Sequence, residues 1–187
     1  MFERGFKSWC ENTAIQIRKD LKLAAIDPLS ARDLAASLTI PLWTPSDVGG
    51  LSAEATTTLH AEQTGWSALT ISHSGRDAII FNPAHSTRRQ STDIMHELAH
   101  LLMRHDPAKM IFSSGQDAVL RTYDKKQEDE ADWLSGCLLL PRPALLTIVS
   151  AHANTETALE RYGVSQTLFN YRMNVTGVRR QVRSQKH

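Results

Sequence analysis

The stretch STDIMHELAHLLMRH, residues 91–105, decides the fold, because it combines a metal-binding pattern with the signature of a buried helix. Residues 96–100 match the pattern His-Glu-x-x-His. A spacing of four places His96 and His100 on one face of a helix, where both imidazoles can bind one metal ion and Glu97 can reach its water. With 8 His in 187 residues, chance would produce this pattern about 0.02 times. The pattern therefore indicates a metal site.

The residues around this pattern predict a helix over residues 86–104 that is apolar on every side but one. On a helical wheel four polar residues lie within about 100° of arc, namely His96, Glu97, His100 and Arg104. A helix so apolar is expected to be buried, so its polar stripe must face groups that satisfy it. A metal ion in a cleft would do so. The alternative is a buried helix whose two histidines only hydrogen-bond to neighbouring groups.

A third protein ligand is expected from the acidic run Glu-Asp-Glu-Ala-Asp at residues 128–132, because catalytic zinc sites commonly use three protein ligands. This run opens a helix predicted over residues 126–140, in which Glu128 and Asp132 share a face that Glu130 cannot join. The pattern predicts Glu128 as third ligand and Asp132 as acceptor for a ligand imidazole N–H. The alternative is a solvated acidic first turn, favoured by the helix dipole.

Length and composition place the chain among globular proteins. At about 150 residues per domain, 187 residues make roughly 1.2 domains. A hydrophobic share of 41% and a charged share of 22% argue against disorder or a coiled coil. A formal net charge of +1 gives no reason to expect nucleic acid or a membrane surface as partner of the whole chain. Two cysteines, Cys10 and Cys137, and no long apolar run predict a cytoplasmic protein without a membrane segment.

The rest of the chain predicts a β-hairpin between helices, so the expected fold class is α+β. The two strands are expected at residues 67–71 and 77–81, and the second is expected to align an extended peptide beside the metal helix. Residues 40–43 are typical of an edge strand because of Pro41. Residues 109–124 show no clear pattern. Further helices are expected at residues 6–23, 30–38, 52–63, 143–151, 155–162 and 165–173.

The two metal-site segments together resemble the ImmA/IrrE family of zinc metallopeptidases, which have a thermolysin-like, zincin-like core. The second family segment reads Glu-x-Glu-Ala-Asn-x-Phe-Ala-x-x-Leu-Leu-Met-Pro, and residues 128–141 match its register without a gap. Four positions depart from it: Asp132 replaces Asn, Leu134 and Ser135 replace Phe and Ala, and Leu140 replaces Met. Weaker likenesses lie outside these segments, such as Asn-Pro at residues 82–83. The resemblance implies a cytosolic endopeptidase of bacterial or phage origin. Relatives inactivate a helix-turn-helix repressor and so switch on mobile-element, DNA-damage or anti-phage defence genes.

The predicted activity is zinc-dependent cleavage of a peptide bond in such a repressor. One Zn²⁺ per chain, held by His96, His100 and Glu128, would polarise the scissile carbonyl and acidify water, while Glu97 acts as general base. A zinc hydrolase acting on a non-protein amide is an alternative. For His105 a helix-end or packing role is preferred. The residue that stabilises the oxyanion stays open among four candidates: His73, His105, Tyr123 and His152.

We predict a metallopeptidase core at residues 1–150, a small helix-turn-helix-like appendage at residues 151–177 and a basic, disordered tail at residues 178–187. Residues 161–187 contain six Lys or Arg and no acidic residue, so this segment could contact phosphates. The preferred interpretation is that the two helices pack on the core. The alternative is a DNA-binding regulator with a structural zinc site. Its candidate phosphate contacts are Arg172, Arg179, Arg180 and Arg183.

Overall fold

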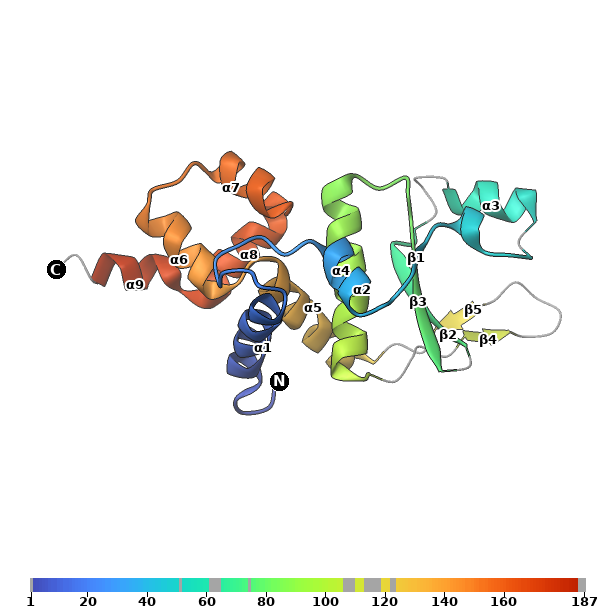
Figure 1. The fold of residues 1–187 in the computed structure, drawn as a ribbon, viewed down its shortest axis with the longest axis horizontal. Coiled ribbons are helices and arrows are strands. Elements are labelled where there is room, and N and C mark those ends of the chain that lie inside the picture. The colour runs from blue at the N-terminus through green and yellow to red at the C-terminus, as the bar shows by residue number, and fades with distance from the viewer. Residues whose placement is uncertain are drawn as a thin grey trace.

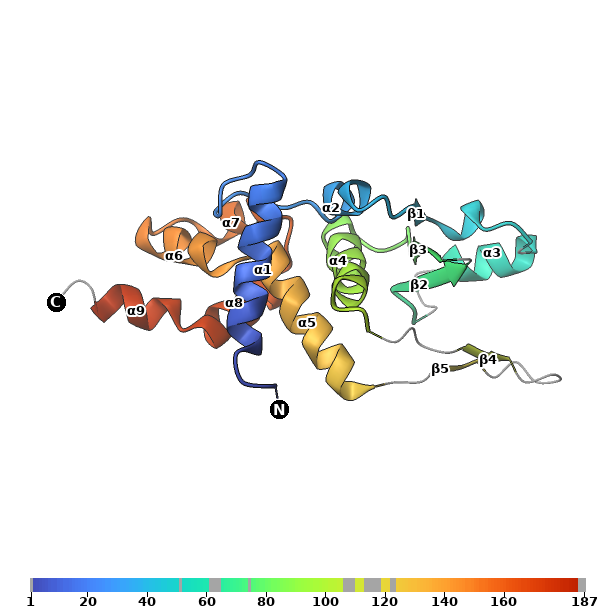
Figure 2. The ribbon, with the colours of Figure 1, turned by 60° about the horizontal axis from the view of Figure 1, so that its bottom comes forward.

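The computed structural model describes residues 2–50, 52–60, 65–73, 75–105, 110–112, 119–121 and 124–184. The long helix α4 (Thr87–Met103) lies in the middle of the molecule. Figures 1 and 2 show a small sheet on one side of α4 and the helices α1 (Phe6–Asp20) and α5 (Lys125–Leu139) on the other. The fold is α+β with a helical C-terminal part, as predicted.

The sheet has the strand order β1-β3-β2. Strands β2 (Ala68–His73) and β3 (Arg76–Phe81) form the predicted antiparallel hairpin, and Gly75 takes a φ of 74° at its turn. Strand β1 (Leu42–Trp43) pairs with β3 in parallel. Strand β3 is therefore central among the described strands. The strand at the edge of the sheet next to α4 is β2. This differs from the expectation that residues 77–81, which form β3, align a peptide.

The helices follow the predicted order, and several of them, though not α1, start with a side chain that accepts hydrogen bonds from the first turn. Ser86 caps α4 and Asp124 caps α5. No single helix of the described residues is long and apolar enough to cross a membrane, although α5 and the following helix at Arg142–Ser150, bent by 50° relative to each other, together meet that test by length and composition. The remaining elements are α2 (Ala31–Ser37), the short 3-10 helix η1 (Pro45–Asp47), α3 (Ala53–His60), β4 (Met110–Phe112), β5 (Val119–Arg121), α6 (Arg142–Ser150), α7 (Thr155–Tyr162), α8 (Gln166–Thr176) and α9 (Val178–Ser184).

One hydrophobic cluster joins the C-terminal helices to the rest of the molecule. It contains Leu98 of α4 and Leu134 of α5 together with Phe169 of α8 and Val178 of α9. The expectation of a disordered tail is wrong for residues 178–184, because Val178 and Val182 lie on one face of a helix and are both buried. Residues 185–187 lie outside the described residues, and the division into domains stays a prediction.

The segment without a clear sequence pattern contains a second, two-stranded sheet. Strands β4 and β5 pair antiparallel, with Met110 opposite Arg121 and Phe112 opposite Val119. Three-residue strands are too short for alternation of apolar and polar residues to be recognised in a sequence. This is why the pattern gave no assignment there.

Candidate metal centre

Helices α4 and α5 bring together the three residues expected to bind a metal. The Nε2 atom of His96 lies 3.0 Å from Nε2 of His100 and 3.1 Å from Oε2 of Glu128. Nε2 of His100 lies 3.7 Å from Oε1 of Glu128. Two ligands of a tetrahedral zinc ion are about 3.4 Å apart, given zinc–ligand distances near 2.1 Å. The two imidazoles and the carboxylate therefore fit Zn²⁺ in both chemistry and spacing.

Packing of small and branched apolar side chains holds the two helices side by side. Leu98 and Ala99 of α4 and Ala131 and Leu134 of α5 are all fully buried. Because the apolar sides of both helices are used in this way, their polar side chains meet next to the contact. Glu128 lies in the first turn of α5, where the N-cap at Asp124 fixes the start of the helix.

Glu97 is buried, with 5% of its surface exposed, and a strand residue holds its carboxylate. The Thr70 hydroxyl of β2 donates a hydrogen bond of 2.7 Å to Oε2 of Glu97. Thr70 pairs with Ile79 across the hairpin. Sequence reasoning missed Thr70, because no local signal shows which hairpin residue faces the metal helix. The contact orients the carboxylate that stands beside the two histidines.

Asp132 lies where the sequence predicted it. Its Oδ1 is 2.9 Å from Nδ1 of His96, so the ring can direct Nε2 to a metal while Nδ1–H donates to the carboxylate. Burial by itself would lower the pKa of His96. The hydrogen bond and charge of Asp132, with the charges of Glu97 and Glu128, more than offset this and raise the pKa above its ordinary value.

His105 combines the expected helix-end role with a side-chain contact that the sequence did not predict. Its main-chain N–H bonds to the carbonyl of His100, which is the expected helix-end role. Its side chain, however, contacts the centre: Nδ1 lies 2.9 Å from Nδ1 of His100, and Nε2 lies 3.4 Å from Oε2 of Glu130. Burial lowers the pKa of His105 below its ordinary value, although Glu130 opposes this. With both nitrogens in contact with these groups, His105 is a poor oxyanion donor.

The other oxyanion candidates do not reach the centre in the described part of the chain. His152 is exposed in the loop after α6, which Figures 1 and 2 both place away from α4. Tyr123 and the side chain of His73 lie outside the described residues.

A family model described as the IrrE N-terminal-like domain (Peptidase_M78) matches residues 54–174. The chain belongs to this family. The match runs from α3 to α8 and includes the hairpin and both helices of the metal centre. The family is one of metallopeptidases, which implies a bound metal, typically zinc, and His96, His100 and Glu128 form a fitting site. No curated protein matches the sequence.

The C-terminal helix pair of this IrrE-like chain forms as predicted, but one of its proposed DNA contacts is wrong. Arg172 of α8 is fully buried, because its guanidinium donates to the Leu140 carbonyl at the end of α5 and to the Glu11 carboxylate of α1. It cannot touch a phosphate. Three other candidates are exposed on α9 and their contact with DNA stays a prediction: Arg179, Arg180 and Arg183.

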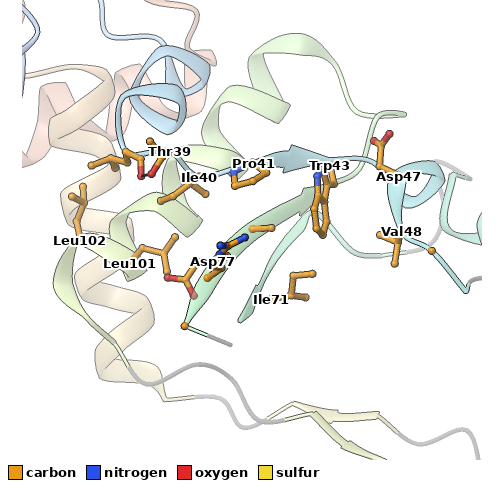
Figure 3. A pocket seen from close by; sticks show the side chains of 15 residues that line it. Thr39, Ile40, Pro41, Trp43, Asp47, Val48, Ile71, Asp77, Leu101 and Leu102 are labelled. Carbon is orange, nitrogen blue, oxygen red and sulfur yellow. Dashed lines mark hydrogen bonds between the residues drawn. The ribbon is translucent and has the colours of Figure 1, made fainter. Parts of the chain in front are cut away.

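A cavity of about 1010 Å³ lies beside the sheet rather than at the histidines. Figure 3 shows Ile40 and Trp43 from the β1 region, Ile71 of β2 and Leu101 and Leu102 of α4 around it. Most of these side chains are apolar. None of the metal-centre residues lines this cavity, so it is a feature of the sheet edge and not of the centre.

Proposed function

We propose that the chain is a zinc-dependent endopeptidase that cleaves a small helix-turn-helix repressor and thereby derepresses stress, mobile-element or anti-phage defence genes. The observation that carries the peptidase proposal is the convergence of His96, His100 and Glu128 beside the buried carboxylate of Glu97. The resemblance of the two metal-site segments to the ImmA/IrrE family supports a repressor as the substrate.

The proposed chemistry assigns each residue one task. Zn²⁺ held by His96, His100 and Glu128 would supply Lewis-acid chemistry, polarising the scissile carbonyl and making water more acidic. Glu97 accepts the proton of the attacking water and returns it to the leaving amine. Thr70 holds Oε2 of Glu97, so the carboxylate keeps one orientation while it moves the proton.

The edge strand β2 is the proposed place for an extended substrate. An edge strand offers unpaired main-chain groups that a peptide can pair with by β-augmentation. Thr70 lies within β2 and contacts Glu97. A peptide paired with β2 would therefore run close to the carboxylate that moves the proton.

Incubation of the purified, zinc-loaded chain with its candidate repressor tests the proposal. Cleavage should occur, and a chelator should stop it. Glu97→Gln should keep zinc, because Glu97 is not one of the three converging ligands, and should lower the cleavage rate by about 100-fold or more. Cleavage at the wild-type rate by Glu97→Gln with verified zinc would contradict the mechanism. If incubation with an unprimed peptide library yields no cleavage product, the alternative of a zinc hydrolase acting on a non-protein amide is favoured.

The rival function, a DNA-binding regulator, makes a different prediction. Helix α8 would be its recognition helix, yet the one basic residue of α8 is the buried Arg172. The proposed phosphate contacts then come from α9, through Arg179, Arg180 and Arg183. Duplex binding that weakens with salt, survives zinc removal and is lost when these three become Gln would favour the regulator.

A further inference from the structure

The C-terminal end of α4 folds back toward the metal centre. The last helical residue is Met103, and Arg104 takes a left-handed conformation with a φ of 55°. The N–H of His105 bonds to the His100 carbonyl at 3.0 Å, and the N–H of Arg104 bonds to the Leu101 carbonyl at 3.1 Å. This pair of bonds is a Schellman motif, which brings the second residue past the helix back beside the last turn. In this chain the two residues brought together are His105 and His100.

The side chains continue this contact as a chain of polar groups. Nδ1 of His105 lies 2.9 Å from Nδ1 of His100, and the two rings meet at an interplanar angle of 71°, edge to face. Nε2 of His105 lies 3.4 Å from Oε2 of Glu130. The exposed fractions of these side chains are 16% for His100, 8% for His105 and 13% for Glu130. These side chains are mostly buried, and buried polar groups are expected to form hydrogen bonds.

The Glu130 carboxylate, at the end of this series of hydrogen-bonding groups, determines which ring nitrogens carry protons. An ionised carboxylate only accepts, so Nε2 of His105 must carry the proton that it gives to Glu130. Nδ1 of a neutral His105 is then an acceptor, and Nδ1 of His100 must donate to it. Nε2 of His100 is left with a lone pair, and this nitrogen is the one that lies beside His96 and Glu128. Lys126 also faces this carboxylate, with Nζ 3.7 Å from Oε1 of Glu130.

We propose that Glu130 and His105 are positioning residues that hold His100 in its metal-binding tautomer through this hydrogen-bonded chain. The inference rests on the proposed zinc site. Nδ1 of His96 contacts the Asp132 carboxylate directly. Nδ1 of His100 is linked to the Glu130 carboxylate through the imidazole of His105. In both arrangements the supporting hydrogen bond is made by Nδ1, and Nε2 is the nitrogen that faces the metal position. Neither His105 nor Glu130 touches substrate in this scheme.

Long-range ¹H–¹⁵N NMR of the metal-free protein tests the tautomers without any need for activity. At a pH where the histidines are neutral, we expect the proton of His100 on Nδ1 and the proton of His105 on Nε2. In His105→Phe, which keeps a ring but removes both nitrogens, His100 should shift to the Nε2–H tautomer that is usual in water. A proton on Nε2 of His100 in the wild-type protein would overturn the proposal.

Zinc affinity, measured by competition with a chromophoric chelator, is the second readout. His105→Phe and Glu130→Ala should each weaken zinc binding by about 10- to 100-fold. The matched control is Asp129→Ala, which removes a neighbouring carboxylate that pairs with Lys125 instead and should leave the affinity unchanged. Equal affinities for wild type, His105→Phe and Glu130→Ala would overturn the proposal, and Glu130→Ala decides if His105→Phe fails to fold. If the wild-type protein binds no zinc, the proposed function fails, while the tautomer result stands on its own.

Discussion

Replacement of Thr70 by Val removes one hydroxyl next to the proposed general base and changes little else. Valine has nearly the shape of threonine and suits a strand equally well. The lost bond is 2.7 Å long and ends on Oε2 of Glu97, whose surface is 5% exposed. A hydrogen bond to a charged group contributes about 1.5–3 kcal/mol. At about 1.4 kcal/mol for each factor of ten, kcat/KM should fall by roughly 10- to 150-fold.

The assay for this prediction is the rate of repressor cleavage, measured with zinc content and the free energy of unfolding for each variant. Thr70→Ser keeps the hydroxyl and serves as the matched control, so its rate should stay close to wild type. Zinc content should not change in either variant, because Thr70 contacts Glu97 and not a metal ligand. A Thr70→Val enzyme within about twofold of wild type would refute the reasoning that this bond orients the base.

Three further predictions concern the interior of the molecule. Arg172→Met should lower the free energy of unfolding by about 3–5 kcal/mol, because it leaves the Glu11 carboxylate without its buried partner; urea denaturation measures this, and a loss below about 1 kcal/mol would contradict it. Cys10 and Cys137 should resist alkylation by iodoacetamide in the folded protein, because both are fully buried and burial raises the pKa of Cys10 to about 12. Mass spectrometry measures the alkylation, and a rate equal to that of the unfolded chain would contradict the prediction. Tyr162→Phe should cost about 0.5–1.5 kcal/mol in thermal or urea unfolding, because its hydroxyl donates to the Ile26 carbonyl at 2.6 Å, and no change would show that water replaces the bond.

Much of the centre could be predicted from the sequence because helical spacing is local. His96, His100 and Glu97 share a stripe in any helix, and Glu128 and Asp132 share another. The structure brings these stripes together as expected. The candidate metal ligands are therefore the part of the site that local sequence spacing indicates best.

The supporting residues could not be predicted, because their positions depend on tertiary structure or on an unusual turn. Thr70 reaches Glu97 only through the placement of the hairpin against α4. His105 lies two residues beyond Met103, the last residue of α4, so helical spacing does not place its side chain. Glycine is the ordinary signal for such a reversal, whereas this chain has Arg104 with a φ of 55°. Arg172 was expected to contact phosphates. Its burial could not be predicted, because its partner Glu11 is 161 positions away in the sequence.

Every second residue of the acidic run at residues 128–132 of α5 contacts a histidine of the centre or its neighbour. Glu128 offers an oxygen to the metal position, Asp132 accepts from His96, and Glu130 holds His105. Glu130 does not share the face of its two neighbours, so it can serve the centre only because the chain reverses at the end of α4 and brings His105 to it. The three residues of the His-Glu-x-x-His pattern are thus held by different neighbours: His96 by α5, Glu97 by β2 and His100 by the reversal. A site built in this way depends on the packing of α4 against both the sheet and α5, and the motif helix alone could not maintain it.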